Sequence, residues 1–173
     1  MKNIFQAFAR YNRGVNETLM ELLNNLPEGQ IMAETKAFFH SIYETFVHNV
    51  TTDLIWLRRY EKIYPDIKCL KNNEFLSRDE VTMRKDFAKD YRAAFETRKK
   101  ADSLIEEFIH EINEQDFIRA IQYRNFKGEN IEKILWQALL HWFNHQTHHR
   151  GNISVMLDLL GVNNDFSSLI TRI

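Results

Sequence analysis

Glycine and proline are scarce in this chain, and their positions constrain its fold more than any other feature. The 173 residues include only five glycines and two prolines. Proline breaks the interior of a helix and glycine weakens it, so both residues mark the points at which helices end. The long segments between them have helical periodicity. They predict four helices, at about Asn3–Asn24, Ala33–Tyr60, Arg78–Ile112 and Asn130–Leu160.

Local signals support the ends of these helices and predict a strand pair between the last two. Ser77-Arg-Asp-Glu80 has the form of a capping box that opens the third helix, and Gly161 suits the left-handed residue that closes the fourth. Residues 117–128 alternate apolar and polar side chains around an Asn-Phe-Lys-Gly segment, which predicts a short hairpin. Helices this long, without the unbroken heptads of a coiled coil, pack into a compact bundle. We therefore expect an all-α four-helix bundle that forms one domain over residues 1–173.

Composition and charge exclude several classes of protein. The chain is 44% hydrophobic and 27% charged, which is ordinary for a soluble globular protein. Its net charge of −1 argues against a nucleic-acid partner, which normally requires a basic excess. No segment approaches the roughly 18 apolar residues of a membrane span, and the N-terminus lacks the apolar core of a signal peptide. With Cys69 as its single cysteine, the chain suits a reducing compartment, and we expect it in the cytoplasm.

Histidine is concentrated in one segment of the predicted fourth helix. Four of the seven histidines lie within nine residues, at His141, His145, His148 and His149. On a helical wheel with about 100° per residue, the apolar stripe is centred on His149, and His145 lies just inside its edge. Side chains four residues apart on a helix are neighbours, so this pair could grip one metal ion. The alternative is a pair of hydrogen-bonded core histidines, because a third ligand is needed to complete the motif.

Three stretches of the chain carry a resemblance to a known family. They are Tyr11–Asn16, the spacing of His48, Asp53 and Trp56 in the second helix, and the segment from Leu140 to Gly151 that contains the four histidines. Together with the hairpin region that ends at Lys127-Gly-Glu129, they resemble the DinB branch of the DinB/YfiT-like superfamily of four-helix-bundle metalloproteins. The similarity covers nearly the whole chain. Asn152 departs from the family motif, which commonly has glutamine at this position.

The resemblance implies the ligands of a divalent ion. In that family one histidine of the second helix and two of the fourth hold the metal, and the matching positions here are His48, His145 and His149. The helical wheel selects the last two independently, whereas His48 lies away from the apolar arc of its helix and rests on the resemblance alone. Three imidazoles leave a coordination position open, as in a catalytic site. We expect nickel or zinc, with iron and manganese as alternatives.

Other polar residues could surround these ligands. His141, His148 and Arg150 flank them in the fourth helix, and Asp53 lies within the apolar arc of the second. A buried carboxylate needs a partner, for which Arg58, Arg150 and a helix-terminal amide are candidates, and a structural ion pair is favoured over a catalytic base. A Glu107-x-x-His110 motif has the spacing used in di-iron bundles, but such a site needs the motif on two helices.

Known members of the superfamily include thiol-dependent transferases and isomerases. The resemblance therefore implies that the ion activates a low-molecular-weight thiol, or water, to attack an electrophilic small molecule. A thiol-dependent S-transferase is the leading hypothesis, with a hydrolase as the variant that uses water. The alternative is a non-catalytic metal-binding or stress-response protein whose ion is structural or sensing. A metalloprotease is disfavoured because the chain lacks His-Glu-x-x-His. Dimers are common in the family, and we expect a homodimer.

Overall fold

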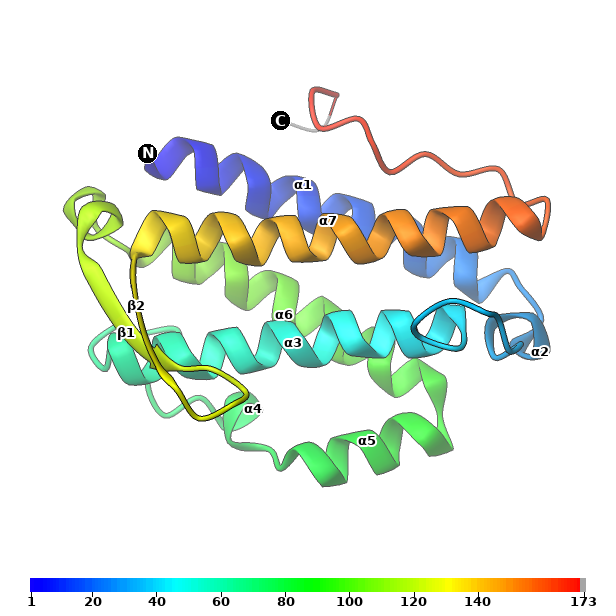
Figure 1. Ribbon diagram of the computed structural model, residues 1–173, viewed down its shortest axis with the longest axis horizontal. Coiled ribbons are helices and arrows are strands. Elements are labelled where there is room, and N and C mark those ends of the chain that lie inside the picture. The colour runs from blue at the N-terminus through cyan, green and yellow to red at the C-terminus, as the bar shows by residue number, and fades with distance from the viewer. Residues whose placement is uncertain (172–173) are drawn as a thin grey trace.

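Four long helices, α1 (Lys2–Asn24), α3 (Ile42–Ile63), α6 (Tyr91–Glu111) and α7 (Leu135–Leu159), make up most of the computed structural model, which describes residues 1–171. They lie side by side (Figure 1). Helices α1 and α3 each pack against both α6 and α7, so the four form a closed ring around a shared core. The all-helical prediction holds for most of the chain, and a small two-stranded sheet is the exception.

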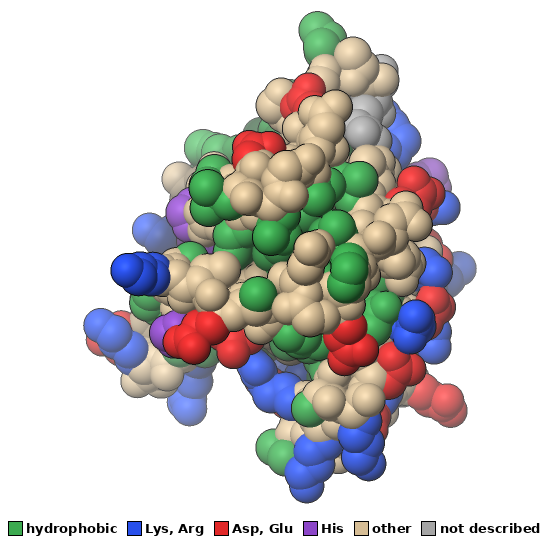
Figure 2. Space-filling view, turned by 90° about the vertical axis from the view of Figure 1, so that its right-hand side faces the viewer, with side chains coloured by type: hydrophobic (Ala, Val, Ile, Leu, Met, Phe, Trp, Pro, Cys, Tyr) green, Lys and Arg blue, Asp and Glu red, His purple; other side chains and the backbone are tan. Residues whose placement is uncertain are grey.

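The shorter elements connect the long helices. Between α1 and α3 lies the single turn α2 (Glu28–Ile31), and between α3 and α6 lie α4 (Glu74–Ser77) and α5 (Glu80–Lys89). The 3₁₀ helix Glu114–Ile118 and the strands β1 (Ala120–Arg124) and β2 (Asn130–Ile134) follow α6. The strand pair and α2 lie at opposite ends of the long helices (Figure 1). Figure 2 looks onto the end that carries α2, where hydrophobic side chains gather in the middle and charged ones surround them.

The first helix matches its predicted range, but the second begins nine residues later than the predicted Ala33. The reason is the N-terminal cap of α3: the Ser41 hydroxyl accepts a hydrogen bond from the Glu44 backbone N–H at 3.0 Å, and the Glu44 carboxylate accepts one from the backbone N–H of His40 at 3.0 Å. These two bonds satisfy backbone donors that no helical partner reaches. Residues 33–41 therefore form a loop instead of two further helical turns.

The predicted third helix, Arg78–Ile112, is two helices in the structure. At Asp90 the backbone is extended, with φ −145° and ψ 110°, and the Asp90 carboxylate caps α6 by accepting from the Arg92 N–H at 3.0 Å. Helix α5 is capped by Asp79, which accepts from the Thr82 N–H at 2.7 Å, so the predicted capping box at Ser77 is wrong. The break lets α5 fold back against α6.

The predicted hairpin is confirmed. Strands β1 and β2 pair antiparallel from Ala120 opposite Ile134 to Arg124 opposite Asn130. The turn is closed by Asn125 Oδ1, which accepts from two backbone N–H groups, and by Gly128, whose φ of 79° favours glycine. The second strand occupies the predicted first turn of the fourth helix, because its backbone pairs with β1. At the other end of α7, Gly161 has the predicted positive φ, 73°.

Aromatic side chains fill the core between the long helices. The Tyr60 ring stacks on Phe108 at 4.7 Å between centroids and lies 5.4 Å from Trp142. Trp142 is fully buried, and Trp56 is almost so, at 3% exposed. This packing fixes α3, α6 and α7 relative to one another, and it thereby sets the distance between the histidines of α3 and α7. None of the helices within residues 1–171 combines the length and apolarity that crossing a bilayer requires.

Candidate metal centre

Helices α3 and α7 bring three histidines together. The Nε2 atom of His145 lies 3.2 Å from Nε2 of His48 and 3.1 Å from Nε2 of His149. The candidate ligand atoms of the three residues all lie within 4.8 Å of one another. The predicted pair four residues apart in α7 thus faces the one histidine that the family resemblance selected from α3. We refer to His48, His145 and His149 as the histidine triad.

The three imidazoles are neutral at physiological pH. Burial, together with the neighbouring histidines, lowers the pKa of His48, of His145 and of His149 to about 4 in each case. A neutral imidazole keeps one nitrogen lone pair, which is the form that binds a metal ion. The triad is therefore ready to coordinate a cation without first losing protons.

The hydrogen-bonding pattern of the rings fits a metal ion. Nδ1 of His145 and Nδ1 of His149 are buried and have no hydrogen-bond partner within residues 1–171. With the ring proton on Nδ1, each Nε2 presents its lone pair to the other two, and a cation at their meeting point would be held by all three nitrogens. Three imidazole nitrogens are the ligand type that suits zinc, nickel, iron and copper. The residues present thus fit a divalent transition metal.

Phe39 covers one side of the triad. Its ring stacks on His48 at 4.3 Å between centroids and meets His149 edge-on at 5.4 Å. Phe39 belongs to the loop that precedes α3, where a hydrogen bond from the Thr35 N–H to the His40 carbonyl at 2.5 Å closes the segment. Sequence reasoning missed this contact because it placed Phe39 inside a helix. The sequence Ser41-x-x-Glu44, a typical signal for the start of a helix, could have predicted that the helix begins after Phe39.

The two flanking histidines predicted around the ligands lie beside the triad without joining it. The His141 ring is 6.5 Å from that of His145 and 5.9 Å from Trp56, between centroids. His148 lies edge-on to His149 at 4.9 Å and forms a hydrogen bond with Asn152 at 3.3 Å. Neither belongs to the group of mutually close ligand atoms.

A cavity of about 610 Å³ lies beside His141, and the lining residues do not include any of the triad. His141 lines it together with Tyr123, Lys133 and Trp136, among others. Since His141 precedes His145 by one helical turn, the cavity offers space for a small molecule near the histidines.

Asp53 and Arg150 belong to the buried polar side chains between the long helices, not to the triad. The Asp53 carboxylate contacts the Arg98 guanidinium and accepts a hydrogen bond from Trp142 Nε1 at 2.5 Å. The predicted ion pair therefore forms, but its partner is Arg98. The predicted partner Arg58 instead donates to backbone carbonyls at the α4–α5 connection. Arg150 donates to Asn12 Oδ1 at 2.5 Å and is 1% exposed.

The network continues to a second carboxylate and is formally neutral. Arg98 also bonds to Asp102, which accepts from Asn16 at 3.0 Å, and all of these side chains are buried. Burial raises the pKa of Asp102 to about 6, against the opposing effect of Arg98. Two aspartates and two arginines from α3, α6 and α7 thus compensate one another, and α1 contributes the amides.

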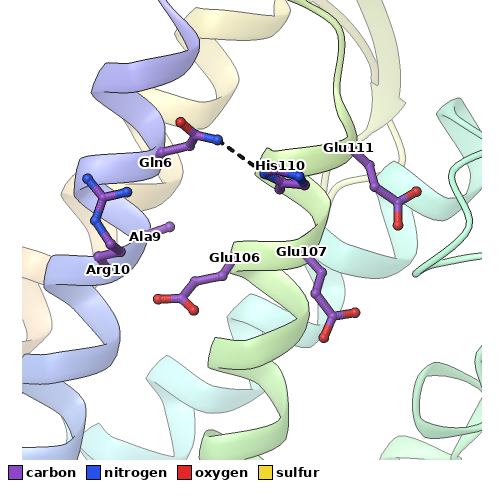
Figure 3. Close-up of a pocket in the computed structure, with 7 residues that line it drawn as sticks. All are labelled: Gln6, Ala9, Arg10, Glu106, Glu107, His110 and Glu111. Carbon is purple, nitrogen blue, oxygen red and sulfur yellow. Dashed lines mark hydrogen bonds between the residues drawn. The ribbon is translucent and has the colours of Figure 1, made fainter.

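The Glu107-x-x-His110 motif does not form a second metal site. Figure 3 shows His110 facing Gln6 of α1, with 3.5 Å between His110 Nδ1 and Gln6 Nε2. The carboxylates of Glu107 and Glu111 point to the side of α6 away from Gln6 (Figure 3). Within residues 1–171, the histidine triad is the one group of three or more histidine, cysteine, aspartate or glutamate side chains that lie close enough together to share an ion.

The fold and the site together define a class of protein. Its members consist of packed helices, and two of these helices contribute three histidines that could hold a metal ion. The chain belongs to the DinB family, whose family model matches residues 1–166. The comparisons find no curated protein and no solved structure that matches the chain.

Proposed function

We propose that this protein is a metal-dependent enzyme with a DinB/YfiT-like four-helix bundle, in which the histidine triad binds one nickel or zinc ion. The reaction we propose is S-transfer: a low-molecular-weight thiol loses its proton, and its sulfur forms a bond to an electrophilic carbon of a small molecule. The group displaced from that carbon leaves with the bonding electrons and takes up the proton. The observation that carries the proposal is the convergence of three Nε2 atoms, 3.1 and 3.2 Å apart, from three neutral imidazoles on two helices. Membership of the DinB family supports it.

The chain's own residues have separate tasks in this proposal. When bound, the ion supplies Lewis acidity, which lowers the pKa of a thiol or of water. The triad holds the ion, the Phe39 ring excludes water from one side of it, and the cavity beside His141 receives the electrophile. Substitution of water for the thiol would make the same site hydrolytic.

One observation favours the alternative of a structural or sensing ion. Phe39 already contacts both His48 and His149, and His148 lies 4.9 Å from His149 between ring centroids. A closed site with a fourth protein ligand would hold an ion without a position for substrate. The two proposals therefore differ in whether a small thiol can reach the ion.

Turnover measured with and without the ion tests the enzyme proposal. Metal-free protein, and the same protein loaded with nickel or zinc, would be screened with small thiols and a chromogenic electrophile. We expect thiol-dependent turnover only in the loaded protein, and its loss in His145→Ala but not in His110→Ala, a histidine outside the triad. Full turnover by metal-free protein would overturn the proposal. An ion whose binding supports no turnover with any thiol would favour the structural alternative.

We also propose that the protein is a cytoplasmic homodimer that acts on a small molecule and binds neither nucleic acid nor membranes. Exposed apolar side chains on α7, with Val155 at 60% and Leu159 at 82% exposure, support self-association. Light scattering after size exclusion would give twice the mass of one chain, whereas a monomer at all concentrations would contradict it.

A further inference from the structure

A second cavity lies between α3 and the hairpin, and its lining is strongly basic. Its volume is about 740 Å³. Five of the residues that line it carry a positive charge and none carries a negative one; the five are Arg58, Arg59, Lys62, Arg119 and Arg124. The whole chain has a net charge of −1. Positive charge is therefore concentrated at this cavity although the chain as a whole is nearly neutral. The clustered cations make the electrostatic potential inside the cavity positive.

Arg59 is held in the cavity by aromatic rings instead of a carboxylate. Its guanidinium carbon lies 4.7 Å from the Trp56 ring centroid, 4.9 Å from that of Tyr123 and 5.3 Å from that of Phe126. One N–H donates to the Arg124 carbonyl at 3.1 Å. A guanidinium has five N–H donors, so most of them stay free. Burial lowers the pKa of Arg59, and within residues 1–171 this guanidinium forms no ion pair.

The other cations are also largely free of carboxylates. Within residues 1–171, only Arg119 of the five forms an ion pair, with Asp116 at 2.8 Å. Arg124 donates through Nε to the Asn130 side chain at 3.3 Å, which leaves the outer edge of its guanidinium free. Lys62 is exposed and has no bonded partner in the described chain. Arg58 already donates to the backbone carbonyls of Leu76 and Arg78. The free donors that line this cavity therefore come from Arg59 and Lys62 of α3 and from Arg124 of β1.

We infer that this cavity binds a small polyanion, a molecule that carries two or more phosphate or carboxylate groups. Guanidinium groups match both kinds of anion through paired N–H donors, and the adjacent lysine adds a point charge. A single cavity in a chain of net charge −1 suits a small ligand better than a nucleic acid, which needs an extended basic surface. Arg59 lies eleven residues beyond His48 in α3, about 16 Å along the helix, so this site is separate from the triad.

Calorimetric titration of the full chain tests this inference, with pyrophosphate and citrate as probes and acetate as the monovalent comparison. We expect pyrophosphate, citrate or both to bind, acetate not to bind, and affinity to fall as salt is added. The Lys62→Gln/Arg124→Gln protein should bind at least about tenfold more weakly, because two charged contacts are lost. Lys100→Gln, an exposed lysine of α6, is the control for a general change in charge, and it should bind as the parent does.

Two further variants distinguish the basic cavity from the histidine triad and from a general attraction of anions to the protein surface. Arg59→Lys keeps the charge but loses the paired donors, so we expect weaker binding with an unchanged circular dichroism spectrum. His145→Ala should bind the anions normally, whatever becomes of the metal proposal. If pyrophosphate binds more tightly than citrate, the cavity prefers phosphate groups; if citrate binds more tightly, it prefers carboxylate groups. Absence of heat with both probes would overturn the inference. Equal weakening by Lys100→Gln, or tight binding of a short oligonucleotide in place of the small anions, would overturn it too.

Discussion

At the residue scale, the chemistry of the site depends on keeping imidazoles neutral. The triad is buried enough for the pKa of each histidine to fall to about 4, yet the three Nε2 atoms still meet in one place. Buried polar atoms without partners are costly, and a shared cation would give the three facing nitrogens a common partner. The same property makes the metal-free protein sensitive to acid.

The lowered pKa values predict how stability changes with pH. In the unfolded chain these histidines have a pKa near 6.5, so between about pH 6.5 and pH 4 the unfolded state binds more protons than the folded one. Metal-free protein should therefore lose stability as pH falls through this window and show no contribution from the triad above it. Urea unfolding at several pH values measures this. The raised pKa of Asp102 has the opposite effect, because it makes the folded state more stable as pH falls. The parent protein is therefore compared with His145→Gln, whose free energy of unfolding should fall less over this pH range. Equal losses in both proteins would contradict the account.

The position of the Phe39 ring over the triad predicts that this ring slows the release of a bound ion. Removal of its ring in Phe39→Ala opens the side of the triad that the ring covers, so a chelator should strip the ion several times faster. Because Phe39 is only partly buried, the free energy of unfolding of the metal-free protein should change little. Phe38→Ala is the matched control, since Phe38 is 91% exposed and should leave the stripping rate unchanged. Equal rates in all three proteins would show that the ring does not shield the ion.

At the scale of elements, the buried polar network fixes how the helices sit. Asp53 of α3 joins Arg98 of α6 and Trp142 of α7, and Arg150 of α7 joins Asn12 of α1. The triad requires α3 and α7 to keep one spacing and one rotation. Bonds with directional geometry specify that arrangement more narrowly than apolar contacts do.

Loss of the Asp53 carboxylate should destabilise the fold strongly. Asp53→Ala removes one partner of a buried ion pair and leaves the indole N–H of Trp142 without its acceptor. We expect a loss of about 3–5 kcal/mol in the free energy of unfolding. Asp66→Asn, at a side chain that is 97% exposed, should change it by less than about 0.5 kcal/mol. Denaturant unfolding measures both, and a loss at Asp53 as small as that at Asp66 would contradict the role of the network.

The cap of α3 shows what sequence reasoning could and could not supply at this scale. Periodicity located α1 and most of α3, α6 and α7, because their buried faces repeat along the chain. The periodicity predicted starts for α3 and α6 that lie too far toward the N-terminus. The reason is that the side-chain caps at Ser41 and Asp90 fix where each helix begins, even though the periodic pattern continues before them.

Ser41→Ala should therefore lower the free energy of unfolding by about 1 kcal/mol and loosen the loop that carries Phe39.

At the scale of the whole molecule, sites form between segments that are far apart in sequence. The pair His145 and His149 could be predicted from helical spacing, whereas His48 required the family resemblance, since it lies away from the apolar arc of its helix. Phe39 and the Asp53–Arg98 contact could not be predicted, because each depends on how distant elements pack. The basic cavity was missed for the same reason: its charges come from α3 and from residues 119–124.

The metal content of untagged protein, purified without nickel resin, tests the central claim most directly. His48 and the α7 pair lie 97 or more residues apart, so their joint action depends entirely on the fold. Elemental analysis after incubation with zinc or nickel and dialysis should find one ion per chain in the parent protein and in His40→Ala, an exposed histidine outside the triad. It should find almost none in His48→Ala or His145→Ala. Parent protein that retains no ion, or a His48→Ala protein that retains a full equivalent, would contradict the account.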